Sequence, residues 1–152
     1  MSYNLSQRSL DRLKGVDERL QRVVKRAIEL SKQDFMVLEG IRTRKQCMIN
    51  YGKGRTIAQC VAKGVPAQYA NPRAAKVTWL NDPFASKHVT GKAVDLVPYP
   101  VDWNDLKKFD AIAQAMLQAA KELGVPVRWG ADWDNDGKPR ERAESDSPHF
   151  EI

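Results

Sequence analysis

The sequence contains only two histidines, and each lies in a short polar segment that also carries a carboxylate. His88 precedes Asp95 by seven residues, and His149 follows Asp146 by three residues. Two imidazoles, one carboxylate and a water molecule form a ligand set that is typical of catalytic zinc. The residue types therefore allow a metal-assisted hydrolysis, provided that the fold brings the two segments together.

The segment around Asp95 has the alternation of a strand. If residues 93–97 are extended, Asp95 lies on the face opposite to its two apolar neighbours and interrupts an otherwise apolar strand. Gly91 allows the chain to turn before this strand, so the side chain of His88 can fold back. We therefore expect His88 and Asp95 to lie close together.

The last residues of the chain show a similar alternation. Phe150 and Ile152 would pack into the core, which leaves His149 and Glu151 on the opposite face. Two histidines and one carboxylate can then converge. A structural role stays open at this point, because an isolated histidine is commonly a surface residue or a hydrogen-bonded core residue, and Asp95 could simply cap a turn.

The segments that position these residues include both helices and strands. Apolar residues recur with a helical period over 16–31, and a second helix, capped by Asp102, should begin at Trp103 and end at Gly124. Residues 64–86 predict a long surface connection. Further expected elements are strands over 35–38, 93–99, 125–129 and 148–152 and a helical segment over 43–62, interrupted near Gly52 and Gly54. This mixture predicts one α+β domain over residues 1–152, with helices packed on a small antiparallel sheet.

Composition and charge restrict the class of protein. A chain of 152 residues with 42% hydrophobic residues can form one globular core. No run of about 20 apolar residues is present, so we expect no membrane span, and residues 1–15 lack the pattern of a secretory signal. The net charge of +6 predicts attraction to nucleic acid or to the anionic bacterial envelope. Cys47 and Cys60 form no metal-binding or redox pair, and we expect buried thiols.

The two histidine segments resemble the motifs of the zinc D-alanyl-D-alanine carboxypeptidases and L-alanyl-D-glutamate endopeptidases. The similarity is strongest to the phage endolysins of this group and covers nearly the whole chain. It implies the α+β fold of the Hedgehog and D,D-peptidase type, with one zinc ion. The matching segments are Ser86-x-His88-x-x-Gly91-x-Ala93-x-Asp95, Asp146-x-Pro148-His149-Phe150-Glu151, Gly40-Ile41-Arg42-Thr43 with Gln46, Trp129-Gly130-Ala131-Asp132-Trp133, and the N-terminal Leu5-Ser6-x-Arg8-Ser9-Leu10-x-x-Leu13-x-Gly15-Val16.

The resemblance assigns roles to the residues at the matching positions. His88, Asp95 and His149 are the expected zinc ligands, Asp146 is the expected general base, and Arg42 is expected to bind substrate and the transition state. Zinc lowers the pKa of bound water from 15.7 to about 7. Asp146 would accept the proton of this water and deliver it to the leaving amine, while Arg42 would stabilise the developing negative charge.

Other residues near these motifs have less defined roles. Ser86 matches a position beside the substrate in the family that the chain resembles. Glu151 shares a face with His149, and it either orients a ligand imidazole or is an ordinary strand residue. Trp129 and Trp133 either line the substrate groove or belong to the core.

The acidic segment after Trp129 invites comparison with a calcium loop. Asp132, Asp134 and Asp136 are followed by Gly137, as in the opening of such a loop. The twelfth position would be Ala143 instead of the usual glutamate, and no helix clearly flanks the segment. We therefore interpret the segment as a polar turn, with a calcium site as the alternative.

These observations predict a zinc endopeptidase that hydrolyses the L-Ala–D-Glu bond of peptidoglycan stem peptides and lyses bacterial cell walls. The Asp146 base and the N-terminal segment favour this activity over that of a D-Ala–D-Ala carboxypeptidase. A zinc-binding relative that has lost catalysis is disfavoured by Asp146 and Arg42. A basic, non-enzymatic module that binds nucleic acid is the alternative from another class, but the sequence shows no RNP, zinc-finger or helix-turn-helix signature.

The same reasoning yields expectations about partners and location. We expect a monomer that has no separate wall-binding domain and no nucleic-acid partner. Its positive charge would hold it to the anionic envelope. Without a signal peptide, the enzyme would accumulate in the host cytoplasm and reach the wall through a separate pore-forming protein.

Overall fold

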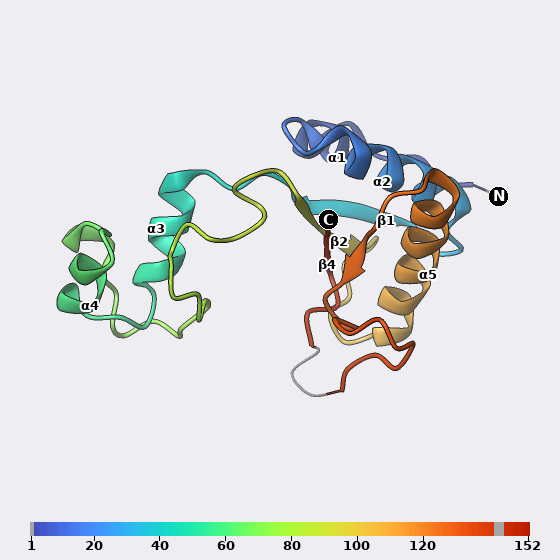
Figure 1. The fold of residues 1–152 in the computed structure, drawn as a ribbon. Helices are drawn as coiled ribbons and strands as arrows, with labels where there is room; N and C mark the ends of the chain where they lie inside the picture. Colours follow the sequence, from blue (N-terminus) through green and yellow to red (C-terminus); the bar gives the residue numbers. More distant parts are fainter. Residues whose placement is uncertain (1, 142–144) are drawn as a thin grey trace. The chain divides into compact units, whose positions relative to one another are not determined.

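The computed structural model describes residues 2–141 and 145–152. Contacts between Cα atoms divide the chain into two compact units, Met1–Ile41 with Gly91–Ile152 and Arg42–Thr90. Each unit is described by itself below, and the expected organisation as one domain stays a prediction. The chain contains both helices and strands, and the predicted α+β class is confirmed (Figure 1).

The first unit is built on a four-stranded antiparallel sheet with the strand order β1-β2-β4-β3. Strand β2 is internal because it pairs with β1 on one side and with β4 on the other. In the second pairing, Asp95 lies directly opposite His149. The strands are β1 (Phe35–Glu39), β2 (Ala93–Pro98), β3 (Arg128–Trp129) and β4 (His149–Glu151).

Three helices belong to the same unit, namely α1 (Gln7–Leu13), α2 (Glu18–Leu30) and α5 (Leu106–Leu123). Helix α2 packs along α5, while α1 packs on β1 and α5 on β2 (Figure 1). The sheet contributes Val94, Leu96 and Phe150 to the core between sheet and helices, and all three are fully buried. Because side chains alternate along a strand, Asp95 and His149 lie on the other face of the sheet.

Two expected elements in this unit begin later than predicted, and one helix was not predicted. Helix α5 begins at Leu106 after the N-cap residue Asp105, because Asp102 instead accepts a hydrogen bond from the backbone N–H of Asn104 (3.0 Å) and forms a turn. Strand β3 has two residues where residues 125–129 were expected. Helix α1 was not predicted, and Ser6 caps it by accepting a hydrogen bond from the N–H of Ser9 (3.2 Å).

The second unit, residues 42–90, contains the helices α3 (Arg44–Gly52) and α4 (Ile57–Ala62) and the short 3-10 helix η1 (Ala67–Tyr69). Thr56 and Gln59 form a capping box at the start of α4. Tyr51, Cys60 and Val65 form a small core. Both cysteines are buried and neither forms a disulfide, as expected. Within the described ranges, no helix has the length and apolar character needed to cross a membrane.

Candidate metal centre

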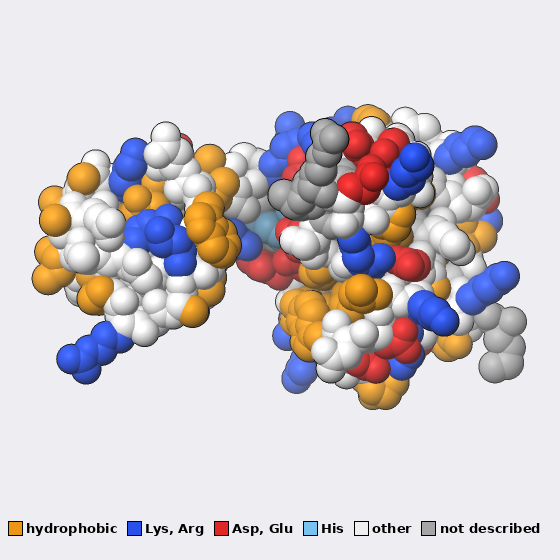
Figure 2. Space-filling model, turned by 90° about the horizontal axis from the view of Figure 1, so that it is seen from below, with side chains coloured by type: hydrophobic (Ala, Val, Ile, Leu, Met, Phe, Trp, Pro, Cys, Tyr) orange, Lys and Arg blue, Asp and Glu red, His pale blue; other side chains and the backbone are white. Residues whose placement is uncertain are grey.

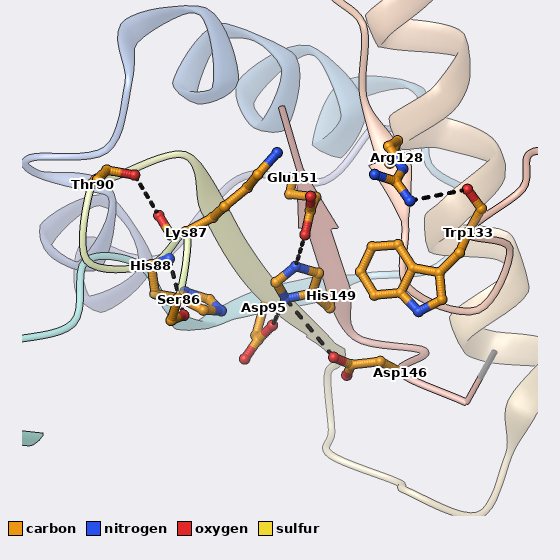
Figure 3. A network of polar contacts seen from close by, with 10 residues as sticks. All are labelled: Ser86, Lys87, His88, Thr90, Asp95, Arg128, Trp133, Asp146, His149 and Glu151. Carbon is orange, nitrogen blue, oxygen red and sulfur yellow. Dashed lines mark hydrogen bonds and ion pairs between the residues drawn. The ribbon is translucent and has the colours of Figure 1, made fainter. Parts of the chain in front are cut away.

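Three of the predicted site residues form a group that is consistent with a metal site. His88, Asp95 and His149 each offer one ligand atom, and these atoms lie within 4.8 Å of one another. Both histidines are buried, and Asp95 is half-buried (Figure 3). The arrangement therefore supplies two imidazole nitrogens and one carboxylate oxygen.

The strand register and one tight turn position these side chains. Asp95 and His149 are opposite each other on β2 and β4, so their side chains leave the same face of the sheet. Gly91 precedes β2 in the left-handed region (φ 74°), and a Cβ there would lie 2.6 Å from the carbonyl oxygen of Gly15. The carbonyl of Gly91 also accepts a hydrogen bond from the N–H of Asp17 (2.8 Å). A glycine at position 91 thus permits both the turn and the close approach of the two backbones.

The imidazole of His149 has an acceptor facing each of its nitrogens. Nε2 lies 2.9 Å from Oε1 of Glu151, and Nδ1 lies 3.2 Å from Oδ1 of Asp95 (Figure 3). Burial lowers the pKa of His149, but the contacts with Asp95 and Glu151 outweigh this effect and raise the pKa above its usual 6.5. A neutral imidazole carries a proton on only one of its two nitrogens, so its other nitrogen points a lone pair at a carboxylate oxygen, either that of Asp95 or that of Glu151. The geometry therefore favours a cation at that nitrogen. This cation is a proton or a metal ion.

The donor set fits zinc. Two histidine nitrogens and one carboxylate oxygen are common zinc ligands, and three protein ligands leave one position for water or substrate. Ligand atoms around a tetrahedral zinc ion lie about 3.3 Å apart. The 3.2 Å separation between Nδ1 of His149 and Oδ1 of Asp95 is close to this spacing. The glutamate behind Nε2 also matches the carboxylate–histidine pairs that orient metal ligands.

The predicted general base lies beside this group. Oδ2 of Asp146 is 3.9 Å from Nδ1 of His149, which is too long for a hydrogen bond (Figure 3). The Asp146 side chain is 53% exposed, whereas that of Asp95 is 17% exposed. One carboxylate is thus enclosed beside the imidazole, and the other remains accessible to water and to a substrate. This difference in exposure suits a ligand and a proton acceptor, respectively.

Comparisons with known proteins place the chain in a family. The model of the family described as phage L-alanyl-D-glutamate peptidase matches residues 1–65 and 61–152. This chain belongs to the phage L-alanyl-D-glutamate peptidase family. It is 38% identical to the L-alanyl-D-glutamate peptidase of Escherichia phage T5 over 158 residues, covering 100% of this chain and 99% of the relative. The crystal structure of the Serratia marcescens L-Ala D-Glu endopeptidase ChiX is similar, with a TM-score of 0.64, 28% identity, and coverage of 100% of this chain and 91% of that one.

In this family member, the backbone of Gly130 fixes the spacing between Asp146 and His149. The N–H of Gly130 donates to the carbonyl of His149 (2.7 Å), and its own carbonyl accepts from the N–H of Asp146 (3.1 Å). A Cβ at position 130 would lie 2.3 Å from the carbonyl oxygen of Asp146 and 3.1 Å from Cβ of His149. A larger residue at position 130 would therefore displace Asp146 and His149 from the backbone of residue 130.

Substitution of Gly130 by alanine should reduce the activity of the peptidase by roughly 100-fold, because a displacement of about 1 Å at a catalytic group can cost that much. The measurement is kcat/KM for cleavage of purified peptidoglycan. Gly64→Ala is a suitable control, because its positive φ makes alanine unfavourable there, yet the new Cβ would have no atom within 4 Å. Activity of Gly130→Ala within twofold of the wild type would show that the spacing is not critical.

The two tryptophans of the 129–133 segment have different environments. Trp129 is buried and stacks on Phe150, and its Nε1–H donates to the carbonyl of Ser147 (2.7 Å), so it belongs to the core. The ring of Trp133 lies 5.5 Å from the ring of His149, and the guanidinium of Arg128 lies over it (Figure 3). Sequence reasoning did not assign Arg128 to the site, since no motif includes it.

The structure places Arg42 and Ser86 next to the backbone of His88. The N–H of Arg42 donates to the carbonyl of His88 (2.9 Å), and Oγ of Ser86 accepts from the N–H of His88 (3.3 Å). The first contact links Arg42 to the histidine segment within the second unit, and the second lies inside that segment. They fix the backbone of both residues close to a candidate ligand.

The acidic segment of the peptidase forms a turn. Oxygens of Asp132, Asp134 and Asp136 lie within 4.8 Å of one another. Asp132 accepts hydrogen bonds from the N–H groups of Asp136 (3.2 Å) and Gly137 (3.0 Å), and burial is the main cause that raises its pKa. The twelfth position of the calcium-loop comparison, Ala143, lies outside the described residues. The hydrogen bonds are those of a polar turn, and the three carboxylates could also hold a cation.

Proposed function

We propose that this peptidase hydrolyses the L-Ala–D-Glu bond of peptidoglycan stem peptides with one zinc ion held by His88, Asp95 and His149. The observation that carries the proposal is the environment of His149. Its Nδ1 faces the carboxylates of Asp95 and Asp146, while its Nε2 is held by Glu151. A ligand nitrogen, a ligand oxygen and an accessible base are thus within a few ångströms of one another, in a chain of this family.

When bound, the zinc ion supplies a Lewis acid and makes water more acidic. The half-exposed carboxylate of Asp146 can then accept a proton from the water that attacks the L-alanyl carbonyl. The same carboxylate returns the proton to the departing amine of D-glutamate, so the peptide bond breaks with no net change in the enzyme. This double role requires Asp146 to be ionised in the resting enzyme, and a nearby dication favours the ionised form.

Arg42 is proposed to stabilise the negative charge that develops on the carbonyl oxygen, and Ser86 to contact the substrate. The guanidinium is protonated at all relevant pH values, so its contribution does not depend on a titration. The hydrogen bond from Arg42 to the carbonyl of His88 supports this assignment because it ties the two segments together. Removal of such a donor typically costs on the order of 100-fold in rate.

Glu151 is proposed to orient the imidazole of His149. Its carboxylate is largely buried, with 12% of the side chain exposed, and it lies 2.9 Å from Nε2. A carboxylate in this position fixes the tautomer that carries the proton on Nε2 and leaves the Nδ1 lone pair for the metal. This contact favours the orienting role over that of an ordinary strand residue.

The alternatives are less well supported. Both the phage T5 relative and ChiX are described as acting on L-alanyl-D-glutamate, which favours the endopeptidase over a D-Ala–D-Ala carboxypeptidase. The family and the grouped ligands favour an enzyme over a basic module that binds nucleic acid. We further infer that the enzyme works as a monomer and reaches the wall through a separate pore-forming protein.

The test is the chemistry of the ends released from purified peptidoglycan. The zinc-loaded enzyme should expose new amino groups on D-glutamate, which dinitrophenylation followed by hydrolysis would identify. Release of free D-alanine without new glutamate amino termini would indicate the carboxypeptidase instead. Intact peptidoglycan after treatment with a folded, zinc-loaded protein would contradict both activities.

A further inference from the structure

Positive charge is concentrated in the second unit. Residues 42–90 hold nine of the 25 lysines and arginines but only one of the 19 acidic residues, Asp82, which gives a net charge of +8. The other residues of the chain carry 16 basic and 18 acidic side chains, a net charge of −2. The overall charge of +6 therefore does not describe an evenly basic protein. It results from one strongly basic unit and one that is nearly neutral.

Most of the basic side chains of this unit are at its surface, whereas one has a structural role. Arg55 is buried, stacks over the ring of Tyr51 and donates to the carbonyls of Tyr51 (2.9 Å) and Thr78 (2.8 Å). The exposed basic residues are Arg44, Lys45, Lys63, Arg73, Lys76 and Lys87.

The same unit exposes large apolar side chains. Trp79 is 76% exposed, and Ile57 and Val61 are 59% and 58% exposed. Ile57 and Val61 are four residues apart on α4 and share one face of the helix. Cys60, on another face of the same helix, is fully buried. Helix α4 thus presents apolar side chains both to its small core and to the solvent.

Two contacts hold the Trp79 segment beside α4. Arg55, just before the helix, binds the carbonyl of Thr78, and Lys63, just after the helix, donates to the side chain of Asn81 (3.3 Å). The chain between Thr78 and Asn81 is therefore attached near both ends of α4. Figure 2 shows basic and apolar side chains interleaved on the face of this unit that it presents.

We propose that this surface, formed by α4 and residues 73–80, binds the interface of a bilayer that is rich in anionic phospholipid. Clusters of lysine and arginine bind anionic headgroups, and each contributes about fivefold in affinity near the surface. Exposed tryptophan and aliphatic side chains enter the boundary between headgroups and acyl chains. A nucleic acid would use the charges but would gain little from Ile57 and Val61, which offer no stacking surface. The proposal does not depend on the peptidase activity.

The experiment is co-sedimentation of the zinc-loaded, full-length protein with vesicles. Binding to vesicles of phosphatidylglycerol and phosphatidylethanolamine should exceed binding to phosphatidylcholine vesicles and should weaken as salt is added. The double variant Arg73→Ala, Lys76→Ala should lower affinity for the anionic vesicles on the order of 20-fold. Trp79→Ala should lower it about fivefold or more, even though it leaves the charge unchanged.

The matched control is Lys25→Ala with Lys107→Ala, which removes two exposed lysines from the other unit. It should retain nearly the full affinity for vesicles. All variants should keep their circular dichroism spectrum and their rate of cleavage of soluble peptidoglycan fragments, so membrane binding and peptidase activity are read separately. The proposal would be overturned if the control variant lost as much affinity for anionic vesicles as the double variant Arg73→Ala, Lys76→Ala. The proposal would also be overturned if the protein bound duplex DNA as tightly as vesicles and Trp79→Ala had no effect on vesicle binding.

Discussion

The His149→Ala variant is expected to lose both its zinc and its activity. The substitution removes a nitrogen that lies 3.2 Å from Asp95, together with the ring that contacts both Asp95 and Glu151. Zinc affinity should fall by more than about 100-fold, because even the loss of a residue behind a ligand costs 10- to 100-fold. The measurements are zinc content after gel filtration and the rate at which new amino termini appear in purified peptidoglycan.

A milder substitution at the neighbouring position provides the comparison. Glu151→Gln keeps the size of the side chain but replaces the charged acceptor of the hydrogen bond at Nε2 of His149 with a neutral amide. Zinc affinity should therefore fall only by about 10- to 100-fold. Activity at saturating zinc should then return toward that of the wild type. If His149→Ala retained one zinc ion with wild-type affinity, His149 would not be a ligand and the assignment of the site would fail.

The Asp146→Asn variant is expected to keep its zinc and lose its activity. An amide has nearly the size of the carboxylate but cannot accept a proton from water, and general acid–base catalysis typically contributes 10²- to 10⁴-fold. The Asp146 side chain is half-exposed, so the exchange should not disturb folding. The value of kcat should fall by a factor on the order of 10³, while zinc content stays the same.

Asp11→Asn is a matched control for this variant, because the Asp11 side chain on α1 is 52% exposed, close to the 53% of Asp146. It should retain full activity. A parallel loss of zinc and activity in Asp146→Asn would instead make Asp146 a metal ligand. Full activity in Asp146→Asn would require another group as the base.

Sequence patterns predicted the elements that carry the site because these elements have strong local signals. The alternation along 93–97 and at the end of the chain placed Asp95 and His149 on the face opposite to the core, and the pairing of β2 with β4 confirms that face. The predicted start of α5 was wrong because Asp102 and Asp105 are both acceptable N-cap residues by type, so the sequence does not distinguish between them. The amphipathic signal of α1 is only seven residues long, too short to distinguish from a polar terminus.

The sequence by itself determined which donors are present and which face of each strand they occupy. These properties follow from residue type and from the two-residue repeat of a strand, which are local. The tertiary structure decided that Asp95 and His149, 54 residues apart, are opposite each other, and that Glu151 and Asp95 face different nitrogens of one ring. It also decided that Trp133, not Trp129, lies against the ring of His149. Register and side-chain packing depend on contacts between distant segments, and no local pattern encodes them.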